Sequence, residues 1–164
     1  MDRSCRHDAH DVGRRRLFGG LGLLLAGVAV PVSFRPASAA PDTPIKQPAT
    51  PGPAAFMARA EEMRRAAVAA GDQAFGAIVV KDGRIIGEGP SRVVTAQDPT
   101  AHAEMEAIRD AARRAGNRDL SGCLLYATFR PCRMCETAAY WANISRIYVG
   151  DGIRDAGAPG YSSC

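Results

Sequence analysis

The sequence predicts an α/β domain in which helices pack on the faces of a central mixed sheet. Three observations lead to this prediction. Helical patterns of apolar residues alternate with short apolar runs, a hairpin signal joins the first two of those runs, and helical segments separate the later ones. Strands joined by a crossover helix run parallel and a hairpin is antiparallel, so both directions are expected. With 164 residues, 46% of them hydrophobic, the chain is long enough for one domain with a core.

The first predicted elements are a helix over residues 54–70 and a β-hairpin. The helix ends at Gly71-Asp72, and its apolar residues at helical spacing are Phe56, Ala60, Met63 and Ala67. Two short apolar runs follow, at residues 77–80 and 85–86. An Asp-Gly pair between such runs is a hairpin signal, and Asp82-Gly83 supplies it. We therefore expect an antiparallel pair of strands after the first helix.

A second helix is predicted to begin at Asp98-Pro99 and to end at Gly116. Asp98 can cap this helix, and a proline suits the first helical position. The expected buried stripe consists of Ala101, Met105, Ile108 and Ala112.

The rest of the domain is predicted to be strand, helix and strand. Residues 124–128 form a short apolar run typical of a buried strand, and Pro131 begins a helix that extends to about Asn143. Residues 145–149 form the last predicted strand, and Gly150-Asp151-Gly152 turns out of it.

Residues 1–39 have the layout of an export signal. Three arginines at positions 14–16 precede an apolar run over residues 17–30, and Ala37-Ser38-Ala39 offers small residues at the spacing of a signal-peptidase site. The apolar run is shorter than the roughly 18 residues of a membrane-spanning helix. Paired arginines before two apolar residues resemble a twin-arginine signal, which implies export to the periplasm. A retained, uncleaved anchor and an N-terminal helix of the fold are the alternatives.

Removal of residues 1–39 changes the charge of the chain. This segment carries six of the 21 basic residues and three of the 17 acidic ones, so the net charge falls from +4 to +1. The electrostatic argument for a nucleic-acid partner weakens accordingly. Five prolines in residues 40–53 forbid a regular helix or a central strand and indicate a linker or a surface arm. Residues 54–164 are then the working domain.

Two short motifs at predicted helix starts carry the chemistry: His102-Ala103-Glu104 and Pro131–Cys135. Cys132 and Cys135 are three residues apart, so one helical turn can point both sulfurs at one centre. His102, the only histidine after residue 39, can supply a third donor. Three nitrogen and sulfur ligands suit zinc, and the fourth position stays open for water, as in catalytic sites.

Glu104 lies two residues from His102 and can exchange protons with a zinc-activated water without binding the metal. H-x-E followed by P-C-x-x-C is a known signature of zinc-dependent nucleobase deaminases, and both halves are present. A disulfide between Cys132 and Cys135, as in a periplasmic redox protein, is the alternative from another class. Cys123 is expected to be a small apolar core residue and Cys164 an unpaired terminal thiol.

From Phe56 to about Tyr161 the chain resembles the cytidine and deoxycytidylate deaminase superfamily, most closely its guanine deaminase and tRNA adenosine deaminase branch. The segments that carry the resemblance are residues 75–77, 81–87, 98–104 and 131–135. Tyr140-Trp141-Ala142 is similar to the aromatic pair of guanine deaminases. The resemblance implies a three-layer α/β/α cytidine deaminase-like fold, one zinc per chain, usually a homodimer, and hydrolytic loss of ammonia from a base.

The resemblance also implies substrate contacts. Phe75 and Trp141 are expected to contact a bound base as aromatic walls, and backbone N–H groups near Ala103 and Cys132 are expected to orient it. Ser91 stands where such enzymes typically have an asparagine that contacts the base or sugar.

Two further positions depart from the pattern of the superfamily. Arg130 stands in place of a glutamate before Pro-Cys, and Ala74 in place of a proline before Phe-Gly-Ala.

Free guanine or a related small base or nucleoside is the expected substrate. A tRNA and a cytosine or cytidine substrate are the alternatives within the superfamily, and export with a net charge near +1 argues against tRNA. A zinc-binding deaminase-like protein without activity is a further alternative. Expected partners are a second copy of the chain and, during translocation, the twin-arginine export machinery.

Overall fold

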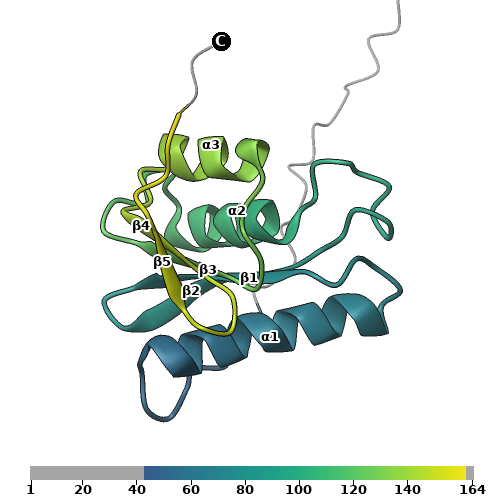
Figure 1. The fold of residues 1–164 in the computed structure, drawn as a ribbon, viewed down its shortest axis with the longest axis horizontal. Coiled ribbons are helices and arrows are strands. Elements are labelled where there is room, and N and C mark those ends of the chain that lie inside the picture. The colour runs from purple at the N-terminus through teal and green to yellow at the C-terminus, as the bar shows by residue number, and fades with distance from the viewer. Residues whose placement is uncertain (1–42, 162–164) are drawn as a thin grey trace, which may run out of the picture. The chain divides into compact units, whose positions relative to one another are not determined.

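The computed structural model describes residues 43–161, and the predicted export signal lies outside them. Figure 1 shows the elements, and their order is α1 (Pro53–Ala69), β1 (Gly76–Lys81), β2 (Arg84–Pro90), α2 (Ala103–Ala115), β3 (Leu124–Ala127), α3 (Arg133–Trp141), β4 (Arg146–Val149) and β5 (Arg154–Gly157). Within the described residues, no helix combines the length and the apolar character needed to cross a bilayer.

The five strands form one mixed sheet in the order β2-β1-β3-β4-β5. β3 and β4 run parallel and are joined by α3, while the other neighbouring pairs are antiparallel. α1 covers one face of the sheet, and α2 and α3 cover the other (Figure 1). The predicted three-layer α/β/α arrangement and the mixed sheet are therefore confirmed.

The hairpin between β1 and β2 is confirmed together with its turn. Asp82 and Gly83 have φ values of 48° and 73°, both in the left-handed region. A two-residue hairpin turn of the favoured hand requires this conformation at both positions, and aspartate and glycine tolerate it best.

The core is divided by the sheet into two layers. Ile78 and Val80 of β1 point toward α1, where they pack with Phe56. Ala77 and Val79 point to the opposite face, beneath α2. Because β1 is buried on both faces, its sequence is a continuous apolar run rather than an alternating one.

Two glycines of β2 set the position of α2. A Cβ atom added at Gly87 would lie 2.5 Å from the carbonyl oxygen of Ala107. A Cβ at Gly89 would meet the backbone of Ala103 and Ala107 even more closely. The helix therefore rests directly on the backbone of β2, and its first turn lies over the carboxyl end of that strand.

The second helix begins at Ala103, so the predicted start at Asp98-Pro99 was wrong. The Asp98 side chain instead accepts hydrogen bonds from the amide (2.7 Å) and hydroxyl (2.8 Å) of Thr100, which makes a local turn. His102 has an extended backbone and is the residue before the helix. The buried stripe also differs from the prediction, because the helix turns its small residues toward the glycines of β2. The buried residues of α2 are Ala103, Glu104, Ala107, Ile108 and Ala111.

The C-terminal part departs from the prediction in two further ways. α3 spans Arg133–Trp141, so it starts and ends about two residues inside the predicted limits of Pro131 and Asn143. Asn143 has a φ of 59°, which ends the helix. The edge strand β5 was not predicted, because its residues are exposed or half-buried and carry no apolar pattern. Cys123 is fully buried in the core, as expected, and Cys164 lies outside the described residues.

The described part of the proline-rich segment lies against the edge strand β2. The Gln47 side-chain amide donates to the carbonyl of Ile85 (2.8 Å), and its oxygen accepts from the amide of Ile85 (2.9 Å). Ile45 packs against the core beside α1, and Lys46 pairs with Glu62 at 3.3 Å. These residues form a surface arm that protects part of an otherwise open strand edge.

Candidate metal centre and active site

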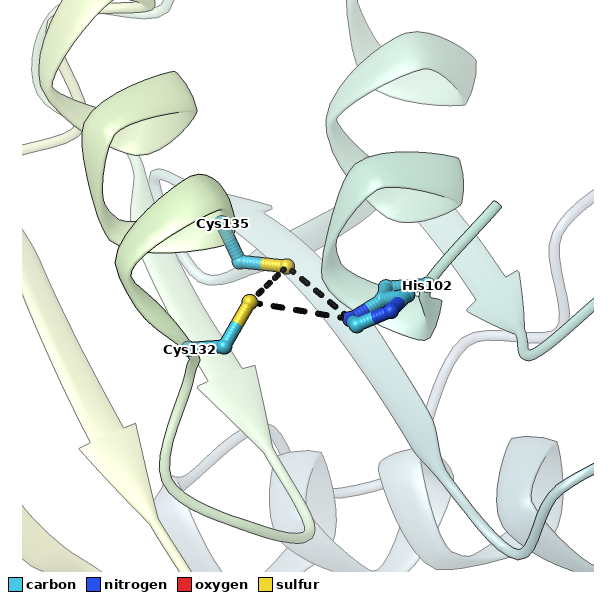
Figure 2. Close-up of side chains that lie close together, drawn as sticks. All are labelled: His102, Cys132 and Cys135. Atoms are coloured by element: carbon cyan, nitrogen blue, oxygen red, sulfur yellow. Dashed lines mark hydrogen bonds between the residues drawn. The ribbon is translucent and has the colours of Figure 1, made fainter. Parts of the chain in front are cut away.

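Three side chains from two helix starts converge on one point. His102 immediately precedes α2, Cys132 immediately precedes α3, and Cys135 lies in the first turn of α3. The Nδ1 atom of His102 is 3.7 Å from the Cys132 sulfur and 3.6 Å from the Cys135 sulfur, and the two sulfurs are 3.6 Å apart. Figure 2 shows all three pointing toward one another. Within residues 43–161, this is the only such group of potential ligands.

The three donor atoms fit a zinc ion. Tetrahedral coordination with Zn–S bonds of about 2.3 Å and Zn–N bonds of about 2.0–2.1 Å places two sulfurs about 3.8 Å apart and a sulfur and a nitrogen about 3.5 Å apart. The distances in the structure agree with these values to within about 0.2 Å, the tolerance of such sites. The sulfurs are much farther apart than the roughly 2.05 Å of a disulfide. The thiols of Cys132 and Cys135 are thus free to act as ligands.

Backbone hydrogen bonds hold the ligand-bearing residues in place. The carbonyl of His102 accepts from the amide of Glu106 (2.9 Å), and the carbonyl of Cys132 accepts from the amide of Glu136 (2.9 Å). Each residue therefore makes the first bond of its helix while its own backbone stays extended. This geometry turns both side chains out of the helix starts and toward the space between α2 and α3.

Burial raises the pKa of the Cys135 thiol, and the nearby negative charge of Glu104 raises it further. The Cys135 thiol also has hydrogen-bonded contacts with Cys132 and Glu104. A thiol in this setting keeps its proton at neutral pH unless a cation lies beside the sulfur. Binding of a metal ion must therefore displace that proton.

Glu104 belongs to a small cavity beside the candidate ligands. Only 8% of the residue is exposed, although it is a glutamate in the first turn of a helix. The cavity has a volume of about 130 Å³ and is lined by Phe75, His102, Ala103, Glu104, Phe129, Arg130 and Cys132. A cavity of about 150 Å³ is known to accept a benzene ring, so this space suits one flat ring.

Two aromatic side chains form one wall of the cavity. The rings of Phe75 and Phe129 meet edge to face, with their centroids 6.0 Å apart. Sequence reasoning proposed Phe75 and missed Phe129. Phe129 lies two residues after β3, in the segment that leads into the Pro-Cys motif, and that position is the signal that could have identified it.

The structure brings most, but not all, of the sequence-predicted site residues together. Ala103 and Phe75 line the cavity with Glu104 and the ligands. Ser91 is 2% exposed, its hydroxyl donates to Asp72 (2.8 Å), and it is not among the lining residues. Trp141 is 66% exposed at the far end of α3, where it packs against Tyr140 and Tyr161 with ring centroids 5.5 Å away in both cases.

The sequence profile described as the cytidine and deoxycytidylate deaminase zinc-binding region matches residues 53–151, more than half of the chain. The chain belongs to this deaminase family. Zinc is the cofactor that the family and the donor set indicate together. The matched region runs from the first residue of α1 to the turn after β4, so it contains both motifs and the whole cavity wall.

Known members of the deaminase family are similar to this chain over part of their length. Guanine deaminase from Bacillus subtilis is 46% identical over 87 residues, which are 53% of this chain and 56% of that protein. A tRNA-specific adenosine deaminase from Aquifex aeolicus is 46% identical over 77 residues, 47% of this chain and 51% of that protein. The chain thus spans a little over half of the length of these relatives.

Solved deaminase structures share the fold. The crystal structure of the B. subtilis guanine deaminase superposes with a TM-score of 0.56 at 43% identity, covering 59% of this chain and 65% of that one. A guanine deaminase structure from Nitrosomonas europaea superposes with a TM-score of 0.60 at 30% identity, covering 63% and 61%.

Proposed function

We propose that this deaminase domain removes an amino group hydrolytically from a nucleobase or nucleoside, with guanine or a related purine as the preferred substrate. The observation that carries the proposal is the convergence of three zinc-compatible donors and a buried carboxylate on one ring-sized cavity. The net reaction replaces the amino group on a ring carbon with oxygen from water and releases ammonia.

The residues of this chain divide into three roles. His102, Cys132 and Cys135 would hold zinc, which supplies a Lewis acid that lowers the pKa of a water molecule to about 7. Glu104 accepts a proton from the attacking water and delivers protons to the ring nitrogen and then to the leaving amine. Its burial beside the ligands keeps the carboxylate within the cavity and out of bulk solvent.

The remaining cavity walls would orient the ring. Phe75 and Phe129 provide the apolar wall, and the backbone at Ala103 is close enough to contribute a polar group. Similarity to two guanine deaminases supports a purine, and similarity to tRNA-specific adenosine deaminases supports tRNA as the second candidate. The net charge of +1 after residue 39 favours the small molecule.

The test combines zinc content with ammonia release from guanine, adenine, cytosine and their nucleosides. We expect about one zinc per chain and turnover of one substrate. Glu104→Gln should retain zinc and lose turnover by a factor of about 100 or more. Glu106→Gln is the matched control, because this glutamate lies on the same helix and pairs with Arg109 outside the cavity. Full activity of Glu104→Gln, or a Cys132–Cys135 disulfide without zinc, would overturn the proposal.

We also propose that residues 1–39 are a twin-arginine-type export signal and that the protein works in the periplasm, anchored if the signal is not cleaved. The arginines, the apolar run and the small residues at 37–39 support this assignment. A reporter fused to residues 1–39 should be exported, and changing Arg15 and Arg16 to lysine should retain it in the cytoplasm. Export of that variant would argue against the twin-arginine route.

A homodimer is the proposed assembly, supported by the resemblance to the deaminase superfamily. Light scattering coupled to size-exclusion chromatography should give twice the mass of the chain. A monomer at micromolar concentration would contradict this expectation.

A further inference from the structure

The carboxylate of Asp72 accepts five hydrogen bonds. One oxygen accepts from the amide of Gln73 (2.8 Å) and from the hydroxyl of Ser91 (2.8 Å). The other oxygen accepts from the amide of Val94 (3.0 Å) and from the amide (2.8 Å) and hydroxyl (2.9 Å) of Thr95. Asp72 lies between α1 and β1, whereas residues 91–95 form the start of the loop after β2. Its side chain therefore ties this loop to the segment that leads into β1.

The same segment carries Phe75, and its backbone is bonded to two other parts of the chain. The amide of Ser91 donates to the carbonyl of Phe75 (3.1 Å). The amide of Gly76 donates to the hydroxyl of Thr128 (3.1 Å), and its carbonyl accepts from the amide of Thr128 (3.0 Å). Ser91 thus joins Asp72 to Phe75, because its hydroxyl is bonded to the first residue and its amide to the second.

The position of the Phe75 ring depends on this backbone. Phe75 is 39% exposed, and Phe129, whose ring it meets edge to face, is 67% exposed. Neither residue belongs to the two core layers, so the close packing of a protein interior does not hold these rings. Because the backbone conformation selects the side-chain rotamer, a shift of residues 72–75 would move this wall of the cavity.

We propose that Asp72 is a positioning residue for substrate binding and that, through Ser91, it holds Phe75 where the ring of the substrate binds. The inference rests on the proposed deamination and deepens it. Ser91 is buried outside the cavity lining, so it serves the carboxylate of Asp72 and not the base or the sugar. The chemical step belongs to Glu104 and to the candidate metal ligands, which lie at the starts of α2 and α3.

Hydrogen exchange, followed by NMR on the zinc-loaded protein, tests the link from Asp72 to Phe75 without a substrate. In Asp72→Asn an NH₂ group replaces one acceptor oxygen, so some donors lose their partner. We expect about tenfold faster exchange at the amides of Val94 and Thr95 and also at the amide of Ser91, whose acceptor is the carbonyl of Phe75. Faster exchange confined to Val94 and Thr95 would identify a local loop contact and overturn the proposal.

Ammonia release separates positioning from a general loss of structure. The substrate is guanine, or the member of the panel above that the wild type turns over fastest. Asp72→Asn should raise KM by about tenfold and leave kcat nearly unchanged, because the wall binds the ring in the ground state and in the transition state alike. Ser91→Ala should raise KM by a smaller factor. A lower kcat with an unchanged KM is the result of partial unfolding and would overturn the proposal.

A double-mutant cycle shows whether the effect passes through Phe75. In a Phe75→Ala background this wall is absent, so Asp72→Asn should raise KM no further. An equal rise in both backgrounds would overturn the proposal. A rise in KM caused by Ser91→Ala in the Phe75→Ala background would indicate direct contact between Ser91 and the substrate, and would overturn it too.

Asp119→Asn is the matched control. Asp119 accepts bonds from the amide (3.0 Å) and hydroxyl of Ser121 and from the side-chain amide of Asn143 (3.1 Å), so it also ties two loops together. It precedes the start of β3, whereas the cavity lies beyond the end of that strand. Its KM should equal that of the wild type. Melting temperature and zinc content show that each variant is folded and loaded.

The positioning role and the proposed function fail in different ways. Ammonia release with a KM that does not respond to Asp72→Asn would overturn the positioning role alone. If no member of the panel releases ammonia, the deamination is refuted. The exchange rate of the Ser91 amide in Asp72→Asn then decides by itself whether Asp72 holds Phe75 in place.

Discussion

Replacing Gly89 with alanine should damage both the fold and the metal centre. Gly89 lies in β2 directly under the first turn of α2, where an added Cβ would collide with the backbone at Ala103 and Ala107. Ala103 is the residue after His102, so any movement of this turn is transmitted to the imidazole. The variant therefore links a packing requirement of the sheet to the affinity for zinc.

The size of the effect follows from the contact distances. An added Cβ would lie 3.1 Å from the carbonyl carbon of Ala103 and closer still to its oxygen, whereas favourable carbon contacts lie at about 3.5–4.0 Å. α2 must then retreat by about 1 Å, because the clash is with backbone and no side chain can rotate away. Overpacking of this kind costs about 1–3 kcal/mol. A shift of about 1 Å exceeds the tolerance of about 0.2 Å for ligand distances, so zinc affinity should fall by at least about tenfold.

Two measurements check this prediction. Urea unfolding of the apo and zinc-loaded protein gives the loss of stability, and competition with a chelator gives the zinc affinity. Gly52→Ala is the control, since Gly52 has an extended φ of 171° and no atom within 4 Å of the added Cβ. Unchanged stability and zinc affinity in Gly89→Ala would refute the conclusion that α2 rests on the backbone of β2.

Three further predictions concern titration and the surface arm. Zinc affinity should fall as pH is lowered from about 8 to 6, because both thiols must lose their protons when they bind the metal. Burial raises the pKa of Cys135, and the charge of Glu104 raises it further, so this proton is hard to remove. A pH-independent zinc affinity in chelator competition would contradict this prediction. Asp72→Asn should be less stable at pH 7. Desolvation raises the pKa of Asp72, but bonds from the Thr95 amide, the Gln73 amide and the Ser91 and Thr95 hydroxyls outweigh it, and the pKa lies well below its ordinary value. The stabilisation by Asp72 is thus fully present above the unfolded pKa of about 3.9 and is lost as pH falls below it. The urea midpoints of wild type and Asp72→Asn should therefore converge in acid. A difference that stays constant with pH would show that the ionised Asp72 carboxylate is not the source of the stabilisation. Gln47→Ala should speed proteolysis of the surface arm and cost about 1 kcal/mol through two lost bonds to Ile85, without changing zinc content.

The elements with strong local signals were predictable from the sequence. Helix α1, the β1–β2 hairpin and the strands β3 and β4 follow from apolar spacing and from Asp82-Gly83. The start of α2 was not predictable in the same way, because Asp98 has the chemistry of a cap and uses it in a turn with Thr100. Strand β5 has no apolar pattern of its own and exists through pairing with β4. Such pairing is a tertiary effect that local sequence does not encode.

The candidate site was predictable where motif spacing determines it. His102, Cys132 and Cys135 were placed together because helix geometry and donor chemistry allow few other arrangements, and Glu104 followed from its spacing. The predicted substrate contact of Ser91 depended on the path of a loop. In the structure its hydroxyl is bonded to Asp72, which spacing alone does not indicate.

The remaining cavity residues share one edge of the sheet, which explains both what was found and what was missed. Gly76 at the start of β1 pairs with Pro90 at the end of β2, and Ala77 pairs with Ala127 at the end of β3. Ala127 pairs in turn with Val149 at the end of β4. Segments next to these strand ends therefore meet, although they are far apart in sequence.

This shared edge of the sheet determines where the cavity-lining residues lie. Phe75 precedes β1, Phe129 and Arg130 follow β3, and the turn after β4 leads to Arg154. The antiparallel pairing of β1 with β3 brings Phe75 to Phe129, and the parallel crossover from β3 to β4 brings Arg130 near Arg154. The aromatic wall of the cavity and these two arginines are thus adjacent because of strand order. A change in strand register here would separate the arginines from Glu104 without altering any motif.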